Sequence, residues 1–100
     1  MQKWIYALPL LALAWGHQAK AADIAAGKAK ATVCAACHGV GGEATVPVYP
    51  HLAGQNAAYL LKQMKAFKEG SRTEPLMAPF MAMLTEADME NLAAYYASLK

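Results

Sequence analysis

The sequence has little net charge and no block of basic residues. Nine Lys and Arg stand against seven Asp and Glu, and two of the basic residues, Lys3 and Lys20, lie close to the N-terminus. Without these two residues the numbers of positive and negative side chains are equal, which argues against a nucleic acid as partner. Internal repeats and low-complexity tracts are also lacking, and no alternation of apolar and polar residues is long enough to predict a paired strand. The composition therefore favours one small domain without a sheet.

Long hydrophobic runs are lacking as well. The apolar run at residues 4–15 follows Lys3, and it is shorter than the ~20 residues that span a bilayer. A short polar stretch and a small-x-small sequence at residues 19–21 come next. This layout is typical of a secretory signal peptide, and the alternative is a retained membrane anchor. We expect a signal peptide over residues 1–21, a mature domain over residues 22–100 and a periplasmic location.

Cysteine is scarce, and both cysteines fall within the run Cys34-Ala35-Ala36-Cys37-His38. The spacing Cys-x-x-Cys-His attaches a c-type haem, because two thiols on one helical turn can bond to the same porphyrin while the histidine binds the iron. We therefore predict one covalently bound haem c, attached through Cys34 and Cys37, with His38 as an axial iron ligand. A mature domain of about 79 residues buries little surface of its own, so we expect the haem-free chain to be largely unfolded.

Three other interpretations of the cysteine motif are open. A dithiol redox site shares the spacing of the two cysteines, but such sites usually lie where a strand meets a helix in a βαβ unit. A zinc site could use both cysteines with His38 and His51, although the adjacent ligands Cys37 and His38 fit one tetrahedron poorly. A structural disulfide leaves the histidine and a methionine-rich loop unexplained. Haem attachment accounts for all of these residues.

The mature chain is predicted to be all-α, with three main helices and two long loops. The predicted helices cover residues 23–33, running into the haem motif, 56–69 and 85–99, and the predicted loops cover 39–54 and 71–84. Asp23 is a predicted N-cap, and Thr85 to Asp88 resembles a capping box. Gly27 lies inside the first helix, where it costs about 1 kcal/mol relative to Ala, so it indicates a close crossing by another helix.

The second axial ligand of the iron separates electron transfer from gas binding or catalysis. The segment before the last helix carries Met77, Met81 and Met83, and a thioether ligand raises the reduction potential of a His-ligated haem. We favour Met77, which lies between two prolines that can hold the loop rigid, although spacing alone does not separate the three. His51 is a further candidate ligand, and we prefer to interpret it as a solvated loop histidine.

Four cations lie on the middle helix and in the turn after it. Lys62, Lys65, Lys68 and Arg72 are candidates for a patch that docks an acidic redox partner. Glu69 interrupts the group, so we prefer to interpret the lysines as the solvated face of the helix.

Several stretches together resemble a known family. They are Gly27-Lys28-Ala29-Lys30, Cys34-Ala35-Ala36-Cys37-His38-Gly39, Pro50-His51-Leu52-Ala53-Gly54-Gln55, Tyr59-Leu60, Arg72-Thr73, Leu84-Thr85-Glu86-Ala87-Asp88 and Leu92-Ala93-Ala94-Tyr95-Tyr96-Ala97-Ser98-Leu99. The chain is similar here to class I cytochromes c of the small bacterial periplasmic type, and to single halves of their di-haem relatives. The resemblance covers nearly all of residues 22–100. It implies a cytochrome c fold of three to four helices wrapped around one covalently attached haem.

The resemblance also implies details of the site. The first and last helices would cross at a glycine and an aromatic residue, here Gly27 and Tyr95. The axial ligands would be a His and a Met, with the Met at the position of Met77. A proline carbonyl would accept the N–H of the proximal histidine, with Pro50 as the candidate and Pro47 as the alternate. A single haem motif excludes electron transfer between haems within this polypeptide.

The expected function is that of an electron-transfer carrier, which is not an enzyme. The iron would change oxidation state while both axial ligands stay bound. Redox protein partners would dock briefly through a small, mostly apolar ring around the haem edge. The alternatives are the haem-bearing subunit of a periplasmic dehydrogenase and a gas-binding cytochrome with an open sixth site.

Overall fold

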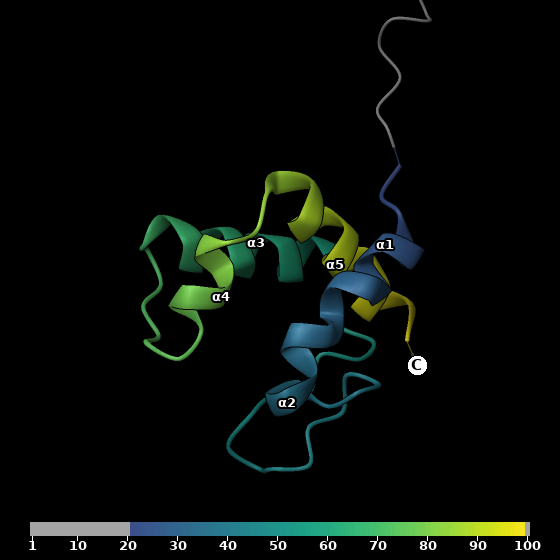
Figure 1. The fold of residues 1–100 in the computed structure, drawn as a ribbon, viewed down its shortest axis with the longest axis horizontal. Helices are drawn as coiled ribbons and strands as arrows, with labels where there is room; N and C mark the ends of the chain where they lie inside the picture. The colour runs from purple at the N-terminus through teal and green to yellow at the C-terminus, as the bar shows by residue number, and fades with distance from the viewer. Residues whose placement is uncertain (1–20, 100) are drawn as a thin grey trace, which may run out of the picture.

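The computed structural model describes residues 21–99, and all of its regular structure is helical (Figure 1). The elements are α1 (Ile24–Lys30), the 3₁₀ turn η2 (Ala31–Cys34), α2 (Ala35–His38), α3 (Ala57–Glu69), α4 (Ala78–Ala82) and α5 (Glu86–Ser98). The all-α prediction is confirmed, since residues 21–99 contain no strand. No helix in this range is long and apolar enough to cross a membrane. The predicted signal peptide, apart from its last residue, lies outside the described residues.

Side chains cap the N-termini of the three main helices. Asp23 caps α1 and Asn56 caps α3, each by accepting a backbone N–H three residues further on at 3.0 Å. Thr85 and Asp88 form the predicted capping box at the start of α5, where each side chain accepts the backbone N–H of the other residue at 3.0 Å. Gly70 caps the C-terminus of α3. Local sequence signals therefore place the ends of these helices.

The first and last helices cross at Gly27, where α1 packs on α5 (Figure 1). A Cβ atom at Gly27 would lie 2.1 Å from the Asn91 carbonyl oxygen and 2.9 Å from Tyr95 Cβ. Only a residue without a side chain allows this approach, so the predicted crossing at Gly27 and Tyr95 is confirmed. The Asp23 N–H adds a bond to Asn91 Oδ1 at 2.8 Å.

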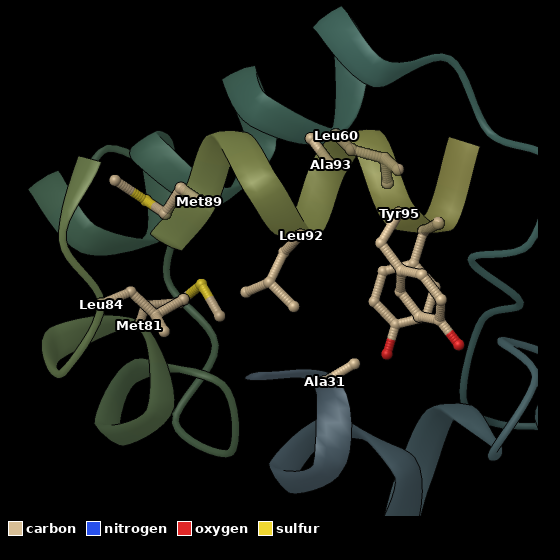
Figure 2. Packing of buried hydrophobic residues seen from close by; sticks show 9 residues of the cluster. Ala31, Leu60, Met81, Leu84, Met89, Leu92, Ala93 and Tyr95 are labelled. Atoms are coloured by element: carbon tan, nitrogen blue, oxygen red, sulfur yellow. The ribbon is translucent and has the colours of Figure 1, made fainter. Parts of the chain in front are cut away.

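One core joins α5 to η2, α3 and α4 (Figure 2). Its buried residues are Ala31, Leu60, Met81, Leu84, Met89, Leu92, Ala93, Tyr95 and Tyr96. Met81 and Leu92 are the largest fully buried side chains, and the end of Met81 lies beside Leu92 in Figure 2. Most of these residues belong to α5, which therefore organises the domain.

Two details of the predicted helices are wrong. The segment 71–84, predicted as loop, contains α4, because Pro79 lies in the first turn of that helix, where a missing N–H costs nothing. The first helix does not run regularly into the haem motif but tightens into the 3₁₀ turn Ala31–Cys34.

Candidate haem site

The haem motif lies where the first helical segment ends. Cys34 is the last residue of η2, and Cys37 and His38 belong to the single turn of α2. Both thiols are free and partly buried. Gly39 follows His38 with φ of 87°, a conformation that residues with a side chain rarely adopt, and it ends the helix. The backbone thus holds two thiols and one imidazole within residues 34–38, all of which are helical.

His38 is buried and its ring is oriented by the following loop. The imidazole is 7% exposed, and its Nδ1 lies 2.8 Å from the Pro50 carbonyl oxygen. A carbonyl can only accept, so Nδ1 carries the proton and donates, and Nε2 keeps its lone pair. Metal-binding histidines are usually oriented by such a second partner. The structure therefore selects Pro50 over Pro47 as the bonding carbonyl, and Nε2 fits the chemistry of an iron ligand.

The second histidine of this region is bonded differently. His51 is exposed, and its Nδ1 accepts the Ala44 N–H at 2.8 Å. In the neutral ring the proton then lies on Nε2, which leaves no free nitrogen lone pair for a metal. This bond favours the interpretation of His51 as a loop histidine over that of an iron ligand.

The environment of Cys34 differs from that of a reactive thiol. Burial raises the pKa of the Cys34 thiol, and a hydrogen bond with Tyr96 opposes this effect in smaller measure. Burial is also the main cause that raises the pKa of the Tyr96 hydroxyl. Redox dithiols depend on a lowered thiol pKa, so this environment disfavours a dithiol site. Within residues 21–99 no three His, Cys, Asp or Glu side chains gather to hold a metal ion, and the zinc interpretation lacks its ligand set.

The three candidate methionine ligands lie in different surroundings. Met81 is 2% exposed as part of the core, and Met83 is 67% exposed. Met77 lies between these extremes, partly buried against the core at the start of α4. Cys34 packs against the same core, so Met77 and the first cysteine of the haem motif contact one cluster. Of the three, Met77 combines contact with the core and a side chain that the core does not fully enclose.

Three of the four cations of the candidate docking patch are bound within the chain. Lys65 pairs with Glu86 of α5 at 2.7 Å. Arg72 lies over the Phe67 ring with its guanidinium carbon 4.5 Å from the centroid. Lys68 donates to backbone carbonyls at and after the end of α4. Sequence reasoning missed these contacts. The partners of Lys65 and Lys68 are more than a dozen residues away in the sequence, and local sequence patterns do not predict contacts of that separation.

Known proteins with similar sequences and structures identify the family of this domain. Residues 24–100 match the family described as Cytochrome c. The whole chain is 45% identical to cytochrome c4 of Pseudomonas aeruginosa, over 50% of that protein's length. It is 43% identical over 81 residues to cytochrome c-554(548) of Halomonas halodenitrificans, which covers 78% of this chain and 98% of that protein.

A solved structure agrees with these sequence matches. The crystal structure of reduced recombinant cytochrome c4 from Pseudomonas stutzeri is similar to this chain with a TM-score of 0.76 and 42% identity, over 80% of this chain and 47% of that one. The chain thus spans about half the length of the cytochrome c4 relatives that it matches.

The residues of the site fit the cofactor of this family. Two free thiols and a buried imidazole with the tautomer suited to a metal lie together within the matched range. The cofactor of the domain is one covalently bound haem c, and the predicted cytochrome c fold is confirmed. The chain belongs to the cytochrome c family.

Proposed function

We propose that this chain is a mono-haem c-type cytochrome that carries electrons in the periplasm and does not act as an enzyme. Cys34 and Cys37 would hold the haem through thioether bonds, and His38 Nε2 and Met77 Sδ would bind its iron. The bound haem supplies a one-electron couple. The observation that supports this proposal most strongly is the 2.8 Å bond between His38 Nδ1 and the Pro50 carbonyl, because it leaves Nε2 unprotonated, as an iron ligand must be.

The residues of the site orient the iron-binding imidazole and exclude water from it, and they transfer no protons. Pro50 fixes the tautomer and the direction of the His38 imidazole, and its bond to Nδ1–H increases the basicity of Nε2. The buried core beside Cys34 and Met77 keeps the surroundings apolar, which limits rearrangement when the charge of the iron changes. Ligands that are held in place and shielded from water suit an electron carrier, because the same ligands must stay bound in both oxidation states of the iron.

Exposed apolar residues beside the ligands in sequence provide the docking surface for redox proteins. Val40 follows His38 by two residues and is 87% exposed, and Leu76 precedes Met77 and is 63% exposed. Small apolar surfaces of this kind support brief contacts, which a carrier needs for fast release. The near balance of charges in the mature chain agrees with a protein partner and not with a nucleic acid.

Export is part of the same proposal. A signal peptide over residues 1–21 is removed to leave the domain 22–100, and the haem is attached after export. N-terminal sequencing of the protein recovered from the periplasm tests this step. A mature N-terminus within one residue of Ala22 is expected, and a retained N-terminal Met1 contradicts cleavage.

The ligand assignment is tested by the near-infrared absorption of the ferric protein, where a bond between thioether sulfur and iron gives a weak band. The band is expected in the wild-type protein and in Met81→Ala, and it should be absent in Met77→Ala. A band that survives Met77→Ala refutes the assignment of Met77.

Two further measurements distinguish the alternative functions. Carbon monoxide binding by the ferrous wild-type protein at neutral pH would favour a gas-binding cytochrome with an open sixth site. Stable copurification with an enzyme chain would favour a dehydrogenase subunit, whereas a carrier elutes alone.

A further inference from the structure

Lys68 reaches from the end of α3 to the end of α4, the short helix whose N-cap is Met77. Its Nζ donates to the carbonyls of Ala82 at 3.2 Å and Met81 at 3.5 Å, and also to the carbonyl of Leu84. Met81 and Leu84 are core residues, whereas Lys68 is exposed. An ammonium group has three donors and no acceptor, so it can serve three carbonyls at once.

The helix α4 is too short to hold its own position. It has five residues, and helices of this length are not stable without contacts to other elements. The last carbonyls of a helix have no partner in a following turn, and a cation placed there bonds them and interacts favourably with the helix dipole. Lys68 thus provides a side-chain link between α3 and the C-terminal end of α4.

Met77 is joined to α4 by backbone hydrogen bonds. Its carbonyl accepts the N–H of Met81 at 3.1 Å, and its own N–H donates to the Glu74 carbonyl at 3.0 Å. Met81, one turn later, is one of the residues whose carbonyl Lys68 bonds. A displacement of the C-terminal end of α4 is therefore transmitted through one helical turn to Met77.

We propose that Lys68 is a positioning residue for the sixth iron ligand, because it fastens α4 to α3 and so holds Met77 where its sulfur can bind the iron. The inference rests on the proposed ligation by His38 and Met77. Without the ammonium the α4 turn opens more often, and the sulfur is dissociated in a larger fraction of molecules. An external ligand that competes with the sulfur then binds more tightly, in proportion to the open fraction.

The test is a spectrophotometric titration of the ferric holoprotein with imidazole at neutral pH and constant ionic strength. Lys68→Gln is expected to raise the apparent affinity for imidazole about tenfold, which corresponds to ~1.4 kcal/mol. Lys68→Arg keeps the charge, but its planar fork cannot direct donors at three separate carbonyls, so an intermediate rise of about threefold is expected. The near-infrared band should remain in both variants without imidazole and disappear at lower imidazole concentrations than in the wild-type protein.

Lys65→Gln is the matched control. It removes one lysine charge from the same helix and breaks the ion pair with Glu86 of α5, but it leaves α4 untouched. Its imidazole affinity should stay within about twofold of wild type, since exposed ion pairs contribute little. A general loosening of the fold would raise the affinity of both glutamine variants alike and would overturn the specific role of Lys68.

The remaining outcomes separate the two proposals. Unchanged imidazole affinity in Lys68→Gln, with a normal band in the wild-type protein, overturns the inference and leaves the Met77 assignment standing. A wild-type protein without the band overturns the Met77 assignment and this inference with it. If Lys68→Gln does not accumulate as holoprotein, Lys68→Arg decides, and an affinity equal to wild type overturns the inference.

Discussion

Replacement of Gly27 by Ala should weaken the contact between the first and last helices. The new Cβ would lie 2.1 Å from the carbonyl oxygen and 2.6 Å from the carbonyl carbon of Asn91. Both are backbone atoms of α5, so the clash is relieved only if α1 and α5 move apart. Overpacking of this severity costs about 3 kcal/mol, and the better helix propensity of Ala returns about 1 kcal/mol.

A net loss of about 2 kcal/mol corresponds to a decrease in Tm of ~8–16 °C for a domain of this size. Thermal unfolding of the ferric holoprotein, followed by circular dichroism, measures this decrease. Gly41→Ala is the control, because no atom lies within 4 Å of a Cβ built there and its φ is not in the left-handed region. A Tm of Gly27→Ala within about 2 °C of the control would refute the reasoning, since ~1 kcal/mol alone shifts Tm by more.

Four other changes have defined outcomes. Thr85→Ala removes the N-cap of α5 and should lower the free energy of unfolding by about 1 kcal/mol in urea titrations; an unchanged value would argue against the capping box. A hydrogen bond from the Thr85 backbone is the largest cause that holds the pKa of Asp88 below its usual value, so the stabilisation by this carboxylate is present above about pH 4 and is lost as the pH falls through the lowered pKa. Asp88→Asn should therefore lose less stability than wild type on acidification, and a parallel loss would contradict this role. Met81→Ala should cost about 2–5 kcal/mol, because Met81 is a fully buried core residue, and a cost below about 1 kcal/mol would contradict its place in the core. The haem-free chain should show little ordered helix by circular dichroism, and a cooperative, near-native melt would overturn that expectation.

Features that depend on neighbouring residues could be predicted from the sequence. The cap at Asp23 and the capping box at Thr85 follow from side chains that bond backbone N–H groups three residues away. Gly27 signalled the helix crossing, because a glycine inside a helix is unfavourable unless something approaches closely. The resemblance to a family suggested Pro50 as the carbonyl that accepts the His38 N–H, with Pro47 as the alternate. The observed bond from His38 to the Pro50 carbonyl then decided between the two prolines.

Features that depend on distant contacts could not be predicted in this way. Two prolines in the segment 71–84 indicated a loop, yet Pro79 is compatible with the first turn of α4, and packing on α3 stabilises that helix. The link from Lys68 to the Ala82 carbonyl joins residues 14 apart. Spacing alone does not separate Met77 from Met81 as the ligand, and the burial of Met81 in the core is a further reason, which the sequence did not show, to prefer Met77.

The attachment of one haem through Cys34 and Cys37 is the feature on which the proposed function depends most. Intact mass spectrometry of the exported protein, made in a host that matures c-type cytochromes, measures it directly. The mass should equal that of residues 22–100 plus one haem, and the haem should remain bound after extraction with acidified acetone. The double variant Cys34→Ser with Cys37→Ser should lose this added mass. A colourless wild-type protein with the mass of its amino acids alone would contradict the proposal.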